Sequence, residues 1–307
     1  MKKSIHVSVP ATSANCGPGF DCLGLALNLC NDFHYTVTDE RPGFHLEVEG
    51  EGRAWLKPSG RNLAYASFLR VWNEVTDRKR IGISIRMQNR IPQSRGLGSS
   101  STAIVAGVLA ASELTGCHFP RERILDYANE LEGHPDNVAP AIYGGFTISI
   151  LEQGRPHTLR IEPAMDLQFI AVVPEQPLST ALARKAIPAQ VPHKDAVFNE
   201  SRTALLVGAL LSGRPEYLAC ALEDRLHQPY RAHLICGMED AFAAGRAAGA
   251  YQCIISGAGS TLMAYASPEA DGDAIGKAMT DALARNGQKA AYHTLKLNRE
   301  GAQILAE

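Results

Sequence analysis

The strongest constraint on the fold of this chain is the segment IPQSRGLGSSS, which occupies residues 91–101. It follows a predicted strand, because apolar and polar residues alternate over 81–85. It precedes a predicted helix, because small and apolar residues fill 102–114 and Gly116 closes them. Gly96 and Gly98 would let the backbone approach an anion without a Cβ in the way. The free N–H groups at the start of the helix would then face that anion.

This segment has two readings when it is taken alone. Serine hydroxyls can donate to phosphate or bind Mg²⁺, which favours a phosphate cradle. The other reading is a glycine and serine cap on a helix that binds no ligand. The segment is not a Walker A loop, because it lacks the GxxxxGK[ST] pattern. Phosphate binding therefore stays a hypothesis at this point.

Composition excludes several classes of protein. The net charge of −2 gives no reason to expect a nucleic-acid partner. No run of 18 apolar residues occurs, so no membrane span is expected. Lys2 and Lys3 are not followed by the apolar stretch of a signal peptide. The seven cysteines are odd in number and lack a CxxC pair, which indicates free thiols in a reducing cytosol.

The remaining periodicity predicts an α+β chain with mixed helices and strands and no strict βαβ repeat. Short strands at 34–39 and 44–48 are expected around a turn at Pro42 and Gly43, and residues 174–194 are expected to form a loop. The other expected strands are 5–9, 146–151, 167–173, 253–256, 262–266 and 291–297. The other expected helices are 62–75 with Asn62 as N-cap, 121–131, 196–211, 215–226, 238–248 and 272–286.

Three further motifs could carry chemistry. Residues 130–137, ELEGHPDN, place three carboxylates, a histidine and an amide where a helix ends, which suits a hard cation or a polar substrate. Residues 256–260, SGAGS, could form a second glycine-rich wall against a ligand, and residues 13–21 offer Asn15 and Asp21 on a constrained loop. Each motif also has an interpretation without a ligand: a helix-capping turn for 130–137, a tight strand-to-helix turn for 256–260, and a plain connection between strands for 13–21.

Together, and in this order, the motifs resemble the homoserine kinase branch of the superfamily of galactokinase, homoserine kinase, mevalonate kinase and phosphomevalonate kinase. The resemblance covers most of the chain. The GLGSS loop is shared by the whole superfamily, while the PATSAN, HPDNVAP and PYR segments are closer to the homoserine kinase branch. The segments that carry it are PATSANCGPGFDCLGLAL (10–27), PQSRGLGSSST (92–102), EGHPDNVAPAIYGG (132–145), LSTALAR (178–184), DAVFNESR (195–202), DRLHQPYR (224–231) and SGAGSTL (256–262).

The resemblance implies an N-terminal domain like ribosomal protein S5 domain 2 over residues 1–165 and a ferredoxin-like domain over 166–307. It implies transfer of the ATP γ-phosphate, with Mg²⁺, to the hydroxyl of L-homoserine, giving O-phospho-L-homoserine in threonine biosynthesis. The expected partners are ATP and L-homoserine in the cytoplasm, without nucleic acid or membrane, and homodimer formation is left open.

The resemblance also implies the residues around the nucleotide and its metal. Glu130 is the first choice for the metal carboxylate, with Ser100 or Ser101 beside it, and Glu132 is the other candidate. The nucleotide residues implied are Asn62, Pro92, Arg95, Gly96, Leu97, Gly98, Ser99, Ser100, Ser101, Thr102, Gly257 and Gly259.

On the substrate side, Arg184 and Arg231 suit the α-carboxylate of an amino acid, and Asp21 suits its α-ammonium group. Asn15 and Thr180 would complete this site. The catalytic residues implied are His134, Asp136 and Asn137. Two mechanisms stay open: His134 or Asp136 acts as a general base, or positioning and electrostatics suffice because the transition state is loose.

Two other functions compete. A kinase of the same superfamily could act on another alcohol, but Arg184 and Arg231 make sense for a carboxylate and not for a neutral sugar. A sensor that has lost catalysis would be expected to carry a damaged phosphate loop or metal carboxylate, and both are intact here. Fold alone does not decide between these functions.

Overall fold

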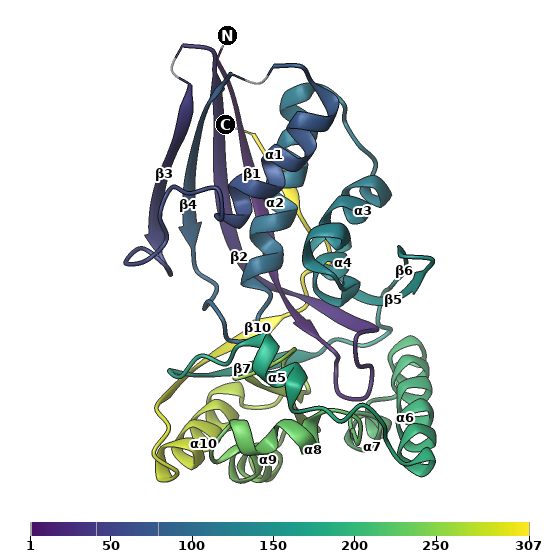
Figure 1. Cartoon of the computed structure of the whole chain (residues 1–307). Coiled ribbons are helices and arrows are strands. Elements are labelled where there is room, and N and C mark those ends of the chain that lie inside the picture. Colours follow the sequence, from purple (N-terminus) through teal and green to yellow (C-terminus); the bar gives the residue numbers. More distant parts are fainter. Residues whose placement is uncertain (1, 41, 79, 307) are drawn as a thin grey trace.

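A computed structural model describes residues 2–40, 42–78 and 80–306. It has two sheets, with helices packed on each, and the first comes mainly from the first half of the chain while the second comes from the second half (Figure 1). The α+β class predicted from the sequence is confirmed. Within the described ranges, none of the helices combines the length and apolar character that a membrane span requires.

The first sheet has seven strands, and its two longest, β1 and β2, pair along almost their whole length. Its main path runs β11-β1-β2-β4-β3, while β5 pairs with both β2 and β6. The strands are β1 (Lys2–Ala14), β2 (Leu23–Thr38), β3 (Gly43–Gly50), β4 (Gly82–Asn89), β5 (Phe146–Glu152), β6 (Arg155–Ile161) and β11 (Gln303–Leu305).

The strands expected at 34–39 and 44–48 correspond to the end of β2 and to β3, and β3 lies beside β4 rather than beside β2. β3 pairs with β4, in parallel, and β2 begins much earlier, at Leu23. The parallel register sets Phe44 opposite Ile83 and Leu46 opposite Ile85. This alignment lets the apolar side chains of β3 pack on the same core as those of β4.

Four helices, α1 (Leu63–Val75), α2 (Ser99–Thr115), α3 (Arg121–Glu132) and α4 (Pro135–Tyr143), lie beside the first sheet (Figure 1). Asn62 caps α1 as predicted, its side chain accepting from the Tyr65 N–H. α2 is buried along most of its length, as its small residues predict. At Gly107, an added Cβ would lie 2.0 Å from Ser67 Oγ, so α1 and α2 cross closely. The periodicity did not predict α4, which begins at Pro135.

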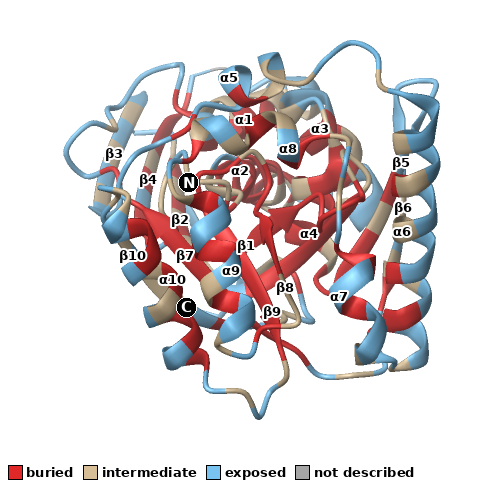
Figure 2. Cartoon of the chain, turned by 90° about the horizontal axis from the view of Figure 1, so that it is seen from below, coloured by how far each residue is buried: buried red, intermediate tan, exposed pale blue. Residues whose placement is uncertain are grey.

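The second sheet is antiparallel, with the order β10-β7-β9-β8. β7 and β9 are buried throughout (Figure 2). Alternate residues of β7 serve different cores: Phe169 and Ala171 face the first half of the chain, and Ile170 and Val172 face α9 and α10. The elements are β7 (Gln168–Pro174), β8 (Gln252–Ile255), β9 (Leu262–Ala266), β10 (Ala290–Lys296), α9 (Met238–Ala247) and α10 (Gly272–Arg285).

Two expectations for the second half need correction. In place of the expected helix at 215–226, the structure has a 3₁₀ turn at Pro215–Tyr217 followed by the short helix α7 (Leu218–Ala221). The helix does not continue because the carboxylate of Asp224 accepts hydrogen bonds from backbone N–H groups of the next turn. The expected loop at 174–194 contains a helix, α5 (Thr180–Lys185). The remaining helices are α6 (His193–Ser212) and α8 (Gln228–Arg231), followed by a 3₁₀ turn at Ala232–Leu234.

The two halves share structure at their boundary. β11, close to the end of the chain, pairs with β1 of the first sheet. Phe169 contacts Phe146 of the first sheet, with ring centroids 6.3 Å apart, and Tyr265 edge-on at 5.0 Å. This common core holds the loops of both halves against one another.

Candidate active site

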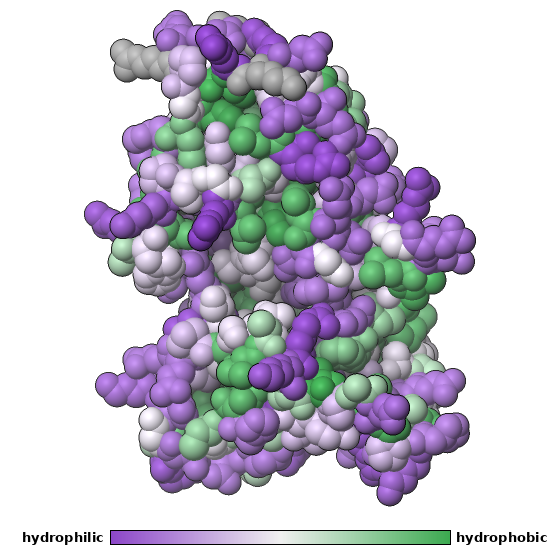
Figure 3. All heavy atoms as spheres, in the orientation of Figure 1, coloured by the Kyte–Doolittle hydropathy of each residue, from purple (hydrophilic) through white to green (hydrophobic). Residues whose placement is uncertain are grey.

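A cavity of about 530 Å³ lies where the two halves meet. Its walls come from the loop after β1, the start of α2, the end of α3, the start of α4, α5 and the loop after β8. Figure 3 shows the surface hollowed at the waist between the upper and lower parts of the molecule. Segments far apart in the sequence thus meet at one site.

The glycine-rich turn forms the floor of this cavity. Gly96 and Gly98 have φ values of +79° and +66°, a region that L side chains rarely adopt. An added Cβ at Gly98 would lie 1.9 Å from Thr12 Oγ1, and one at Gly96 would lie 2.2 Å from the Ser256 carbonyl oxygen. Since α2 begins at Ser99 with no side chain capping its first turn, its N–H groups remain available to an anion.

Hydrogen bonds join this turn to the first and last motifs. The Thr12 N–H donates to the Leu97 carbonyl at 3.2 Å, and Ser256 Oγ donates to the Gly96 carbonyl at 2.6 Å. The SGAGS loop is therefore a wall packed behind the glycine-rich turn, and its Gly257 and Gly259 line the cavity.

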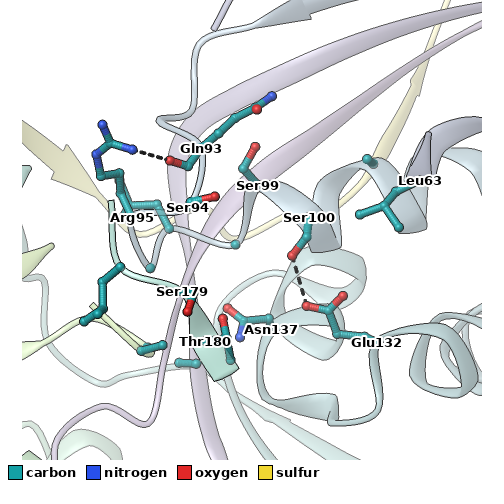
Figure 4. Close-up of a pocket in the computed structure, with 18 of the residues that line it drawn as sticks. Leu63, Gln93, Ser94, Arg95, Ser99, Ser100, Glu132, Asn137, Ser179 and Thr180 are labelled. Atoms are coloured by element: carbon teal, nitrogen blue, oxygen red, sulfur yellow. Dashed lines mark hydrogen bonds between the residues drawn. The ribbon is translucent and has the colours of Figure 1, made fainter. Parts of the chain in front are cut away.

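A carboxylate stands beside the start of α2. Glu132 Oε1 accepts from Ser100 Oγ at 3.1 Å and from Ser101 Oγ at 2.9 Å, with Asn137 and Thr180 close by (Figure 4). Mg²⁺ is commonly held by one or two carboxylates together with substrate phosphates, and this donor set fits that pattern. Among the described residues, no group of three or more His, Cys, Asp or Glu side chains is arranged to hold a metal without such help.

Glu130, the first choice for the metal carboxylate, is not at the cavity. Its two oxygens accept from Arg70 Nε at 3.0 Å and Nη2 at 3.1 Å, on the outer side of α3. The helix turns Glu130 and Glu132 to different sides, because successive residues are rotated by about 100°. The site therefore offers Glu132, the other candidate.

Two arginines and an aspartate also line the cavity. Arg184 makes a bidentate pair with Asp21, at 2.9 and 2.7 Å, and this hydrogen bonding raises the pKa of Arg184. Arg231 is only 2% exposed. Burial, together with the neighbouring charge of Arg184, lowers its pKa to about 10, so Arg231 stays charged at neutral pH. Asn15 Nδ2 donates to the Gly257 carbonyl at 2.8 Å beside them.

His134 and Asp136 line the cavity, and His134 lies within electrostatic reach of both Glu132 and Arg184. His134 Nδ1 is 2.5 Å from Asp136 Oδ1, and this hydrogen bond raises the pKa of His134. Asn137 Oδ1 accepts from Thr12 Oγ1 at 2.8 Å, which fixes the amide next to Gly98. Thr180 begins α5, which Ser179 caps.

The cavity contains most of the residues expected from the sequence, and four expected residues do not line it: Pro92, Ser101, Thr102 and Glu130. The sequence patterns did not indicate a second group of lining residues, most of which are immediate neighbours of expected ones: Ala14, Arg61, Leu63, Gln93, Ser94, Ala103, Ser179 and Ala258. The others are Asn31, Leu56, Met87, Asn89 and Leu178.

Comparison with known proteins gives two family matches and many full-length relatives. The GHMP kinases N terminal domain matches residues 62–145, and the GHMP kinases C terminal domain matches 206–285. The chain is 41% identical to the homoserine kinase of Caldanaerobacter subterraneus subsp. tengcongensis, over 98% of this chain and 95% of that one. It is 43% identical to the homoserine kinase of Streptomyces coelicolor, over 98% and 94%.

Solved structures agree in fold. A crystal structure of homoserine kinase from Cytophaga hutchinsonii superposes with a TM-score of 0.89 at 29% identity, covering 99% of this chain and 98% of that one. L. major mevalonate kinase, in complex with R-mevalonate, superposes with a TM-score of 0.70 at 17% identity, covering 97% and 96%. The second likeness concerns the fold alone.

Proposed function

Because this chain belongs to the homoserine kinase family, and is thereby an ATP-dependent small-molecule kinase, we propose that it transfers the γ-phosphate of ATP to the hydroxyl of L-homoserine. The product is O-phospho-L-homoserine, an intermediate of threonine biosynthesis. One observation carries the proposal: a single cavity joins an anion cradle and Glu132 to two arginines and an aspartate.

The start of α2 binds the phosphates in this proposal. Backbone N–H groups of residues 96–101 and the positive end of α2 face the negative oxygens. Mg²⁺, when bound, supplies neutralisation of the charge on the phosphates. Glu132 would hold it, with Ser100 and Ser101 beside the carboxylate. Asn62, which lines the cavity at the start of α1, would lie near the nucleoside.

The charged part of the cavity binds the amino-acid part of the substrate. An α-amino acid carries one ammonium and one carboxylate group. Asp21 would accept from the ammonium group, and Arg184 and Arg231 would donate to the carboxylate. Asn15 and Thr180 border the same space, so the side-chain hydroxyl would extend toward Asn137 and the cradle.

We propose positioning and electrostatic stabilisation, without a strong general base, for the transfer step. His134 is engaged by Asp136, and its raised pKa favours the protonated imidazole, which cannot accept a proton. In a loose transition state the attacking hydroxyl has formed little of its bond to phosphorus, so its proton can leave after the transition state, to an oxygen of the transferred phosphoryl group, and no base need remove it beforehand. His134 and Asp136 would then orient the hydroxyl and offset charge near the transferred group.

We also propose a cytoplasmic location and ATP and L-homoserine as the partners. All seven cysteines are free, as is usual for proteins of a reducing compartment.

A coupled assay of ADP release tests the proposed function. Purified protein with Mg²⁺ and ATP is supplied in turn with L-homoserine, mevalonate and galactose. We expect ADP release well above background with homoserine and not with mevalonate or galactose. Release with mevalonate or galactose and not with homoserine would reject the assignment.

A further inference from the structure

We propose that His227 is a positioning residue, which holds Arg231 in the orientation that reads the substrate carboxylate and does so as the neutral Nε2–H tautomer. This inference rests on the proposed function in one respect, the role given to Arg231. His227 itself does not line the cavity, so it would act through Arg231.

The partners of His227 fix its tautomer. The side chain is fully buried just before α8. Nε2 lies 2.8 Å from the Gly17 carbonyl oxygen, and Nδ1 lies 3.2 Å from Arg231 Nη1. A carbonyl oxygen can only accept, so Nε2 carries the hydrogen. A guanidinium can only donate, so Nδ1 is bare. Burial also lowers the pKa of His227, which agrees with a neutral ring.

The turn that carries His227 is itself held in place. Asp224 is a buried carboxylate whose Oδ2 accepts from the backbone N–H groups of His227 at 3.0 Å and Gln228 at 2.7 Å. Asn199 of α6 donates to Asp224 Oδ1 at 2.7 Å and to the Pro18 carbonyl at 3.1 Å. The turn before α8 and the loop after β1 are therefore tied together on both sides of the imidazole.

These contacts leave Arg231 one free edge. Its Nε donates to the Ala183 carbonyl at 3.2 Å, and its Nη1 is shared between the Gly257 carbonyl at 3.0 Å and His227 Nδ1. Among the described residues, none accepts a hydrogen bond from Nη2. Because Arg231 lines the cavity, Nη2 is the nitrogen left for a ligand. Without the acceptor at Nδ1, the guanidinium would lose one of the contacts that set its plane.

The same imidazole connects the two ends of the amino-acid site. Gly17 belongs to the loop that carries Asn15 and Asp21, and Arg231 is the buried arginine at the carboxylate end. The Phe20 ring lies among these groups, 5.3 Å from the His227 ring centroid and 5.4 Å from the Arg231 guanidinium carbon. His227 thus sets the spacing between the proposed ammonium and carboxylate partners.

Two isosteric substitutions separate the two hydrogen bonds of His227. His227→Asn puts an amide oxygen close to the place of Nδ1, so it keeps an acceptor for Arg231 and loses the Gly17 contact. His227→Gln puts an amide nitrogen close to the place of Nε2, so it keeps the donor to Gly17 and loses the acceptor. Each variant removes one buried contact, so we expect similar falls in melting temperature.

The kinetic constants of the two variants should differ. We expect His227→Gln to raise KM for homoserine on the order of tenfold, because a charged hydrogen bond is misaligned. Its kcat and its KM for ATP should change little, since the lost contact serves ground state and transition state alike. His227→Asn should keep KM for homoserine within about threefold of the wild-type value, a clearly smaller change than the roughly tenfold rise expected for His227→Gln. Equal rises in both variants, or an equal rise in KM for ATP, would overturn the proposal.

A measurement on the wild-type protein needs neither activity nor a folded variant. ¹⁵N spectra of imidazole-labelled protein distinguish a nitrogen that carries hydrogen from a bare one. At neutral pH we expect His227 to show a protonated Nε2 and a bare Nδ1. An imidazolium or an Nδ1–H tautomer would overturn the proposal. If the wild type failed to phosphorylate homoserine while showing the expected tautomer, the proposed function would fail and the contact to Arg231 would stand.

Discussion

Ser101 Oγ lies 2.9 Å from Glu132 Oε1, and this contact joins the first turn of α2 to the last turn of α3. It brings the carboxylate close to the positive end of α2, where negative charge is stabilised. The same end of the helix faces the cavity, so a cation held by Glu132 would meet the phosphates there. Glu132, Ser100 and Ser101 thus act together in the proposed phosphoryl transfer.

The first prediction uses Glu130 as a matched control for Glu132. Glu132→Gln should lower kcat on the order of 100-fold and raise the Mg²⁺ concentration needed for half-maximal rate, because one anionic metal ligand is lost. Glu130→Gln removes an equal charge two residues away, from an exposed pair with Arg70, and should leave both quantities nearly unchanged. A Mg²⁺ titration of the steady-state rate makes the comparison. A large loss in Glu130→Gln with none in Glu132→Gln would exchange the two roles.

The second prediction concerns Gly98, with Gly116 as its control. Both glycines have positive φ, but an added Cβ meets Thr12 Oγ1 at Gly98 and meets nothing within 4 Å at Gly116. Alanine at either position should cost about 1 kcal/mol of stability through backbone strain. Only Gly98→Ala should also weaken ATP binding, by roughly tenfold or more, because the cradle must shift. Calorimetric titration with ATP checks this, and equal ATP affinities in the two folded variants would refute the cradle.

The third prediction concerns Arg184. Arg184→Lys should raise KM for homoserine by roughly tenfold, because lysine cannot reproduce the paired N–H donors. KM for ATP should stay nearly unchanged. Homoserine amide, whose carboxylate is masked, should bind the wild type poorly and respond little to the substitution. Equal losses for the acid and the amide would mean that Arg184 supports the loop through Asp21 and does not read the carboxylate.

The fourth prediction concerns pH. The pKa of His134 is raised in the folded protein by its hydrogen bond to Asp136. Protonated His134 therefore stabilises the folded protein fully below the ordinary histidine pKa of about 6.5. This stabilisation is lost as pH rises through the raised pKa that His134 has in the folded state. The difference in unfolding free energy between wild type and His134→Gln should be larger at about pH 5.5 than at about pH 8.5. Urea denaturation measures it, and a difference that grows with pH would contradict the assigned pairing.

The sequence predicted those parts of the molecule in which local pattern and final packing agree. The helix that begins at Ser99 and the N-cap at Asn62 follow from local composition, and the structure has both. The pairing of β3 with β4 could not be derived in that way, because two alternating strands near a turn also fit a hairpin. The choice depends on which core the apolar face of β3 joins.

The same limit applies within the site. Two glutamates separated by one residue on a helix cannot be ranked as metal ligands until the neighbours of the helix are known. Arg70 and the α2 serines, distant in the sequence, decide between Glu130 and Glu132. The segment DRLHQPYR supplied Arg231, but the role of His227 depends on Gly17, more than 200 residues away.

The most direct test of the central claim measures the product itself. Protein, Mg²⁺, ATP and L-homoserine are incubated, and ³¹P spectra and ADP are followed together. We expect a new phosphomonoester signal that grows in equal amount with ADP and is absent with Glu132→Gln at the same time points. ADP without a phosphomonoester of homoserine would contradict the central claim, because the bound γ-phosphate would then be passing to water or to another alcohol.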